Sequence, residues 1–341
     1  MSDQIISAPP VSAVPASPDA KKSRGRIIFL AILFLGLLLF PLTQAIFGGM
    51  NYWLHLMLYT FMYISMASSW NILGGYTGYV SLGHNVFFAA GAYLAGILLV
   101  YQGISPFLIT PVAGLLALAI GLIVGLITLR TSGSAFIIST VALILLASIV
   151  MDKWELAGGA NGLSLPLMGL KMATAKIPFY YAFLILAALT IFMSYRIRHS
   201  KFGLGLRAIS QDETKAEVAG IPTHIYKVLA FAISGIFVGM AGALWVYYLT
   251  YLRPGLFLSI GIATHMVLMT LIGGKGTVAG PVIGAAIFIA TNEFFVAQLG
   301  SSELNIVATG IMMILVLLFF PDGVIGTLKN RNRLPRFLDW E

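Results

Sequence analysis

The sequence lacks cysteine and has few charged side chains. None of its 341 residues is Cys, which excludes a disulfide framework, a thiolate nucleophile and cysteine-based metal or iron–sulfur sites. Only 9% of the residues are Asp, Glu, Lys or Arg, whereas a soluble globular domain carries roughly 25%. Hydrophobic residues make up 59%, and the mean hydropathy is +0.95. The composition therefore predicts a protein with several membrane spans rather than about two soluble domains.

The apolar runs have the length of membrane-crossing helices. They last about 18–25 residues, as a hydrocarbon core of roughly 30 Å requires, and they do not alternate every second residue as barrel strands do. Lipid cannot satisfy backbone polar groups, so only helices or a closed barrel can span it. We therefore predict an all-α polytopic membrane protein with about ten transmembrane helices, near residues 27–47, 52–73, 79–101, 106–129, 134–151, 178–195, 226–250, 257–273, 277–297 and 304–320.

The distribution of basic residues predicts the orientation. Residues 1–26 form a Pro-rich tail that ends in four basic residues and is predicted to be disordered; residues 27–320 form the membrane domain, and residues 321–341 form a second basic tail. With both termini in the cytoplasm, sixteen of the 20 Lys and Arg residues, Lys227 included, lie on the cytoplasmic side. This asymmetry supports an even number of spans and explains the net charge of +8 without nucleic acid.

Motifs for enzymatic chemistry are missing. Gly274-Lys275-Gly276 lacks the Ser or Thr that follows the lysine of a Walker A loop, so ATP hydrolysis by this chain is not expected. The five histidines lack metal-binding spacing, and we expect His84 and His265, in or near spans, to make interhelical hydrogen bonds. Glu293 is the only carboxylate well inside a predicted span, which is weak support for proton coupling.

Two glycine clusters, residues 74–84 and 273–281, carry polar residues where one predicted span ends and the next begins. Such breaks leave backbone polar groups that must be buried in protein or face a water-filled path. Glycine pairs of small-xxx-small spacing elsewhere are interpreted as helix packing. We predict that the two clusters contribute to an inner gate or translocation path, through Gly74, Gly75, Thr77, Gly78, Ser81, Gly83, His84, Gly273, Gly274 and Gly280.

Two polar segments leave the predicted membrane. The outer one, residues 152–176, contains the glycine-rich turn 158–162. The inner one, residues 196–227, is the long charged stretch of the chain, and Leu206 to Ala219 predicts one short helix that Gly220 and Pro222 terminate. A short amphipathic helix on the cytoplasmic side either lies on the membrane surface or docks on a partner, and the residues alone leave both open.

Several spaced motifs, in order along residues 52–326, resemble the LivM-type permeases of branched-chain amino acid ABC importers. They are Gly74 to His84 with Phe87-Phe88 and Gly91-Ala92-Tyr93, Gly158 to Gly162, Arg207-Ala208-Ile209, Ala219-Gly220-Ile221, Lys227 to Phe231, Ala241-Gly242-Ala243, Gly273-Gly274, Gly280-Pro281 and Phe320 to Gly323. One departure is Ala157, where the family often has Thr.

The resemblance implies an ABC importer permease fold and a transport subunit of the bacterial inner membrane. The implied partners are a second, LivH-like permease, two cytoplasmic ATPases that hold ATP and Mg, and a periplasmic substrate-binding protein. It also implies that the loop within residues 196–227 forms a coupling helix seated in an ATPase, with mechanical roles for Arg207, Asp212, Glu213, Glu217 and Gly220. No cofactor is expected on this chain itself.

The expected function is therefore ATP-driven import of branched-chain or related amino acids, with permeation of urea or short amides as an alternative within the same class. A self-contained ion-coupled carrier would show inverted repeats and intramembrane charges, and the glycine clusters open the third and ninth predicted spans in the same direction, which does not fit a five-plus-five inverted repeat. A membrane-embedded enzyme would need convergent His, Asp or Glu pairs within the spans, and the sequence has none.

Overall fold

The computed structural model describes residues 32–42, 51–169, 174–299, 302–320 and 322–331. The predicted tail 1–26 and the basic residues Arg333 and Arg336 lie outside this part of the chain. Contacts divide the chain into two units, Met1–Phe40 and Pro41–Glu341. A helix, Ile32–Leu42, begins in the first unit, and the elements that follow all belong to the second.

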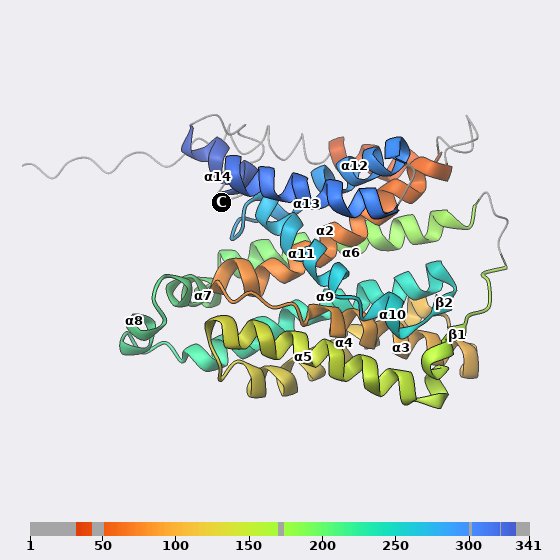
Figure 1. Ribbon diagram of the computed structural model, residues 1–341, viewed down its shortest axis with the longest axis horizontal. Helices are drawn as coiled ribbons and strands as arrows, with labels where there is room; N and C mark the ends of the chain where they lie inside the picture. The colour runs from red at the N-terminus through yellow and green to blue at the C-terminus, as the bar shows by residue number, and fades with distance from the viewer. Residues whose placement is uncertain (1–31, 43–50, 170–173, 300–301, 321, 332–341) are drawn as a thin grey trace, which may run out of the picture. The chain divides into compact units, whose positions relative to one another are not determined.

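The second unit is built almost entirely of helices (Figure 1). Its elements are, in order, α2 (Asn51–Thr77), α3 (His84–Gln102), α4 (Pro106–Thr128), α5 (Gly133–Lys153), η1 (Glu155–Ala157), η2 (Gly159–Asn161), β1 (Leu163–Ser164), α6 (Lys176–Arg198), α7 (Lys201–Gln211), α8 (Glu213–Val218), α9 (Thr223–Leu249), β2 (Tyr251–Leu252), α10 (Pro254–Phe257), α11 (Ile260–Gly273), α12 (Gly280–Leu299), α13 (Ser302–Phe319) and α14 (Gly323–Asn330).

Seven helical segments of the described chain are long and apolar enough to cross a membrane. They are α3, α4, α5, α6, α9, the α10–α11 segment and α12. Helix α2 has 27 residues, but its Tyr, Ser, His and Asn side chains make it more polar than these. Every predicted span overlaps a helix, which confirms a multi-span helical protein; the number ten is not confirmed and stays a prediction.

Helix α9 lies at the centre of the bundle, because it packs against α2, α3, α4 and α6. Glycines permit this close packing. A Cβ added at Gly91 of α3 would overlap the carbonyl oxygen of Gly239 in α9, and one at Gly121 of α4 would approach the backbone of Ala232 to 2.7 Å. The interpretation of the small-residue pairs as packing sites is therefore confirmed for Gly121 and Gly239.

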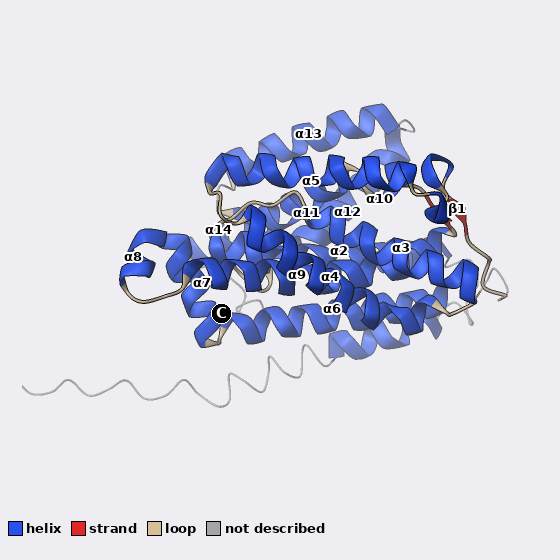
Figure 2. Ribbon diagram, turned by 90° about the horizontal axis from the view of Figure 1, so that it is seen from below, coloured by secondary structure: helices blue, strands red, loops and turns tan. Residues whose placement is uncertain are grey.

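The two polar segments lie at opposite ends of this unit. The glycine-rich turn lies at the β1–β2 end, with Gly158 and Gly162 at φ +83° and +80°, and Leu163 pairs with Leu252 across the two short strands. Helices α7 and α8 lie at the other end (Figure 1), and the long helices run between the two ends (Figure 2). The predicted turn at residues 158–162 is confirmed.

The prediction of one helix from Leu206 to Ala219 is wrong, because α7 and α8 are separate helices. Asp212 lies between them in an extended conformation, φ −163° and ψ 109°, and its carboxylate accepts the N–H of Lys215 at 3.0 Å. An aspartate that caps a new helix in this way competes with continuation of the old one. The predicted stop is confirmed: Gly220 has φ +85°, and the Ile221 N–H bonds the Ala216 carbonyl at 3.0 Å.

Candidate functional site

Helix α2 carries a row of buried polar side chains in a bundle whose core is mostly apolar. Ser65, Ser68, Ser69 and Asn71 are each at most 1% exposed. The Ser65 hydroxyl bonds the Thr190 hydroxyl of α6 at 2.8 Å, and the Ser69 hydroxyl donates to the Ser234 carbonyl of α9. Buried polar groups are stabilised by hydrogen bonds, so the bonds of Ser65 and Ser69 fix α2 against α6 and α9, whereas the buried Ser68 hydroxyl has no partner in the described part of the chain.

Asn71 joins the two glycine clusters. Its Nδ2 donates to the Thr277 carbonyl at 2.8 Å, and its Oδ1 accepts the Gly276 N–H at 2.9 Å. Gly75, one turn further along α2, has no room for a side chain, because a Cβ there would overlap the Asn71 amide and come within 2.7 Å of the Gly276 nitrogen. Gly74 beside it is buried under the Trp70 indole. The structure therefore brings the end of α2 and the α11–α12 loop together at one place.

The α11–α12 loop is itself held by glycines. A Cβ at Gly273 would overlap the carbonyl oxygen of Gly280, and one at Gly280 would overlap that of Gly274. Gly274 has φ +124°, a conformation that L side chains rarely adopt. The Thr277 hydroxyl donates to the Gly274 carbonyl at 2.8 Å and accepts the Gly280 N–H at 3.0 Å. These bonds satisfy the backbone where one helix ends and the next begins.

The α2–α3 loop, residues 78–83, is tied to three helices. The Trp70 indole of α2 donates to the Ser81 carbonyl at 2.7 Å, and the Thr140 hydroxyl of α5 accepts the Leu82 N–H at 3.2 Å. His84 Nε2 lies 2.8 Å from the Ser234 hydroxyl of α9, which confirms its expected interhelical bond.

Smaller contacts complete this loop. At its start the Thr77 hydroxyl accepts the Tyr79 N–H at 3.2 Å, and Gly78 turns the chain with φ +79°. At its end Gly83 approaches Thr140, with a hypothetical Cβ at 3.2 Å from the Thr140 Cβ. His265 makes its expected interhelical contact elsewhere in the bundle, with Nδ1 3.4 Å from the Tyr63 hydroxyl. The predicted gate residues therefore lie in or next to the α2–α3 and α11–α12 loops, and Gly75 at the end of α2 closely approaches Gly276. Asn71, Trp70 and Ser234 are the residues that the sequence pattern did not reveal.

The predicted coupling residues lie on and around α8, but they do not share one role. Arg207, Glu217 and Gly220 are exposed, whereas Glu213 turns toward the bundle. The Glu217 carboxylate accepts the Thr223 hydroxyl at 2.6 Å. The hydrogen bond from the Lys215 N–H lowers the pKa of the Asp212 carboxyl, as is usual for a helix cap.

Glu213 is paired within the chain. Its carboxylate binds the ammonium of Lys227 in α9 and accepts the hydroxyl of Tyr79. Burial alone would raise the pKa of the Glu213 carboxyl, but the hydrogen bonds from Lys227 and Tyr79 outweigh burial and lower it. By sequence alone Lys227 groups with the basic residues on the cytoplasmic side. The sequence feature that could have indicated the Lys227 ion pair is a lysine among apolar residues early in a predicted span, where a charged side chain usually has a partner.

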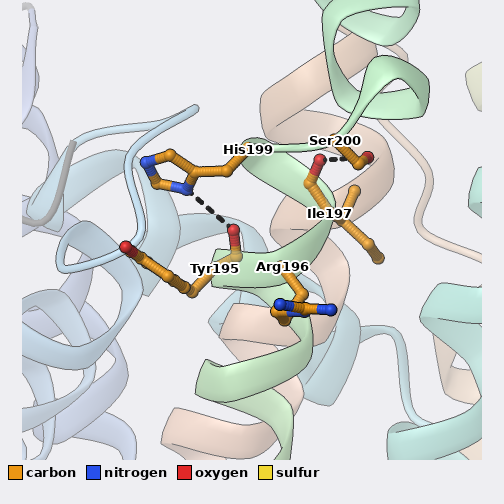
Figure 3. A pocket seen from close by; sticks show the side chains of 5 residues that line it. All are labelled: Tyr195, Arg196, Ile197, His199 and Ser200. Carbon is orange, nitrogen blue, oxygen red and sulfur yellow. Dashed lines mark hydrogen bonds between the residues drawn. The ribbon is translucent and has the colours of Figure 1, made fainter.

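Two shallow surface pockets lie near α7 and α8. The larger, about 600 Å³, is lined by Tyr195, Arg196, Ile197, His199 and Ser200 (Figure 3). Its histidine bonds back to the Tyr195 carbonyl at 2.9 Å and its serine to the Ile197 carbonyl at 2.7 Å, so both polar groups serve the helix end. The second, about 470 Å³, lies beside α8 along residues 220–225 and Glu217.

Comparison with known proteins gives a family match over most of the chain. Residues 52–317 match the family described as branched-chain amino acid transport system, permease component. The chain is 26% identical to the high-affinity branched-chain amino acid transport system permease protein LivM of Escherichia coli K12, over 81% of this chain and 70% of that protein.

More distant similarity extends to other permeases. LivH of Salmonella typhimurium is 34% identical, but over only 42% of this chain and 44% of that protein. The ribose import permease protein RbsC of Haemophilus influenzae is 25% identical over 65% of this chain and 70% of that protein. No solved structure matches the chain.

Proposed function

The chain belongs to the family of branched-chain amino acid transport permease components, and we propose that it is the permease subunit of an ATP-driven importer that moves branched-chain or related amino acids across the bacterial inner membrane. It is a multi-pass membrane protein related to transport permeases rather than to enzymes. The observation that supports the mechanism best is the position of the two glycine clusters: the α11–α12 loop is bonded to α2 through Asn71, and the α2–α3 loop reaches α8 through Tyr79.

In this proposal the energy comes from partner subunits. Two cytoplasmic ATPases hold ATP and Mg, a LivH-like permease completes the membrane pathway, and a periplasmic binding protein delivers the solute. Relatives named LivM and LivH support a pair of permeases. Ten spans with both termini in the cytoplasm would place α7, α8 and the glycine loops on the ATPase side, as the excess of Lys and Arg there also favours.

The α8 surface is proposed as the ATPase docking site. Val218 of α8 is 86% exposed, and Ile225, which is 57% exposed, lines the smaller pocket next to α8. Glu217, which lines the same pocket, and Arg207 of α7 are exposed as well, so this part of the surface offers both apolar and charged groups to a partner. Helix α8 lies between Asp212 and Gly220, so its ends are defined.

The glycine loops are proposed to form the inner gate. A zwitterion crosses a membrane only if polar protein groups replace its hydration. The buried hydroxyls and amide of α2, together with Ser81, His84 and the loop carbonyls, are such groups, and they lie near the end of α2 that faces α7. The assignment as an importer permease also supports the proposed division into a tail (residues 1–26), a membrane domain (27–320) that contains the coupling loop (196–227), and a second tail (321–341).

A second solute class within the same kind of importer is supported by one observation. The similarity to a ribose import permease spans 65% of this chain, so related permeases serve solutes other than amino acids. Uptake of labelled leucine, urea and ribose in the host, with and without the gene for this chain, separates these cases. Loss of leucine uptake alone supports the proposal, and unchanged leucine uptake with loss of another solute contradicts the proposed substrate.

A further inference from the structure

Lys227 is a buried charge close to the start of a membrane helix. It is the fifth residue of α9, and its side chain is only 5% exposed. Taking an ammonium group out of water is costly unless it is paired and hydrogen-bonded. Lys227 meets this condition through two groups from outside its own helix. It binds the Glu213 carboxylate, and its Nζ donates to the Tyr79 hydroxyl at 3.0 Å.

The three side chains form a closed triangle between three elements. Glu213 is the first residue of α8, Tyr79 belongs to the α2–α3 loop, and Lys227 belongs to α9. One Glu213 oxygen binds Lys227 and the other accepts the Tyr79 hydroxyl. The Lys227 ammonium also lies over the Tyr79 ring, 4.5 Å from its centre. Each member therefore contacts both others, so α8 cannot move from α9 without disturbing Tyr79.

Tyr79 continues into a row of buried rings. Its ring packs edge-on against Phe136 of α5, with centres 5.5 Å apart, and Phe136 lies 6.4 Å from Phe231 of α9. Phe231 lies 5.3 Å from the His84 ring at the start of α3. Phe136, Phe231 and His84 are fully buried. Closely packed side chains transmit displacement, because they have no free volume to absorb it.

Helix α8 contacts both α7 and α9. Asp212 breaks the chain on one side and Gly220, at φ +85°, turns it on the other. Ala216 is buried beneath the helix, and Glu217 is bonded to Thr223. The charged pair Asp212–Lys215, at 3.0 Å, joins the cap of α8 to its own helix, with the lysine 85% exposed.

We infer that Glu213, Lys227 and Tyr79 form a positioning link that transmits a displacement of α8 to the α2–α3 loop and the start of α3. The inference rests on the proposed function, because it takes α8 as the element that an ATPase moves. Glu213 thus acts inside this chain and not on the partner surface. The alternative is that the triangle only stabilises the fold, in which case its loss lowers stability but leaves the ratio of transport to ATP hydrolysis unchanged.

The test uses the whole complex, purified from its host through a tag on this chain and reconstituted in lipid vesicles with its binding protein. Labelled leucine taken up per ATP hydrolysed is compared for wild type, Lys227→Met, Tyr79→Phe and the control Lys153→Met, which changes an exposed lysine at the end of α5, outside the proposed docking surface. Methionine keeps the length of the lysine side chain and removes its charge, while Glu213 retains water contact since its side chain is 30% exposed. Phenylalanine keeps the ring and removes the hydroxyl that joins the other two groups.

We expect the Lys227→Met complex to retain its bound ATPases, while the amount of leucine taken up per ATP hydrolysed falls about tenfold, within the usual range of coupling between two sites. Tyr79→Phe should lose about threefold, since the charged pair and the ring contacts remain. Lys153→Met should match wild type. The double exchange Glu213→Lys with Lys227→Glu should recover part of the ratio, a result that loss of stability does not produce.

If wild type and Tyr79→Phe take up equal amounts of leucine per ATP, with the ATPases bound in both, the positioning link is refuted and the proposed function stands. The Tyr79→Phe comparison tests the link even if the Lys227→Met complex fails to assemble. A wild-type chain that brings no ATPase and takes up leucine without ATP would refute the proposed function itself.

Discussion

Replacing Asn71 with Leu should release the α11–α12 loop from α2. The substitution keeps the approximate volume but removes the bond to the Thr277 carbonyl and the bond from the Gly276 N–H, at 2.8 and 2.9 Å. Each lost hydrogen bond costs about 1 kcal/mol, so local opening becomes about 2 kcal/mol easier. Since 1.4 kcal/mol is a tenfold change in an equilibrium constant, the open population should rise about thirtyfold.

Thiol labelling can measure this opening because the chain has no cysteine. A Val278→Cys reporter is suitable, since Val278 is 1% exposed and lies in the loop. When closing is faster than labelling, the rate of maleimide modification follows the open population. We expect the rate in the Asn71→Leu background to exceed that of the reporter alone by about thirtyfold.

Two controls make the result specific. Lys275→Cys, on the exposed part of the same loop, should react quickly in both backgrounds. Thr291→Val removes a hydroxyl that bonds only its own helix, at the Ile287 carbonyl, and should leave the Val278→Cys rate unchanged. Equal Val278→Cys rates with and without Asn71 would show that this side chain does not hold the two glycine clusters together.

Three further predictions concern packing, docking and pH. Gly91→Ala should lower the thermal midpoint of unfolding of the purified chain, because the new Cβ overlaps the Gly239 carbonyl and overpacking costs about 1–3 kcal/mol. The control Gly255→Ala, which has open space around it, should leave the midpoint unchanged. Equal midpoints for the two variants would contradict the close α3–α9 contact. Glu217→Lys or Gly220→Leu should leave membrane insertion intact and uncouple ATP hydrolysis from uptake, and normal coupling in both would count against docking through α8. Because the pKa of Glu213 is lowered in the folded chain, its bonds stabilise the fold above the ordinary glutamate pKa of 4.5 and are lost as the pH falls through the lower folded value. Between about pH 6 and pH 3, thermal unfolding of Glu213→Gln should therefore show less acid destabilisation than that of the wild type. Identical pH profiles would refute the pairing.

The elements that follow local rules were predictable from the sequence. The long apolar runs gave the helices, and the turn at residues 158–162 and the stop at Gly220 follow from the ability of glycine to adopt positive φ. His84 in a span implied a partner, which is Ser234. Each of these depends on the residue itself or on its immediate neighbours.

The features that the hydrophobic pattern does not carry were missed. Asp212 lies within a helical pattern, and its local capping bond to Lys215, three residues further along, starts a second helix. Lys227 was assigned to the basic loop, because the sequence does not reveal that Glu213 and Tyr79 surround it. Asn71 is one polar residue in a long span, and its two partners lie more than two hundred residues away in the chain.

The most direct test of the importer assignment is to purify the tagged chain from its host in mild detergent, identify the proteins that accompany it by mass spectrometry, and assay the same sample in vesicles. We expect a second permease and two ATPases with Walker motifs, and leucine uptake that requires both ATP and the binding protein. A chain that purifies alone and transports leucine without ATP would contradict the assignment and indicate a self-contained carrier.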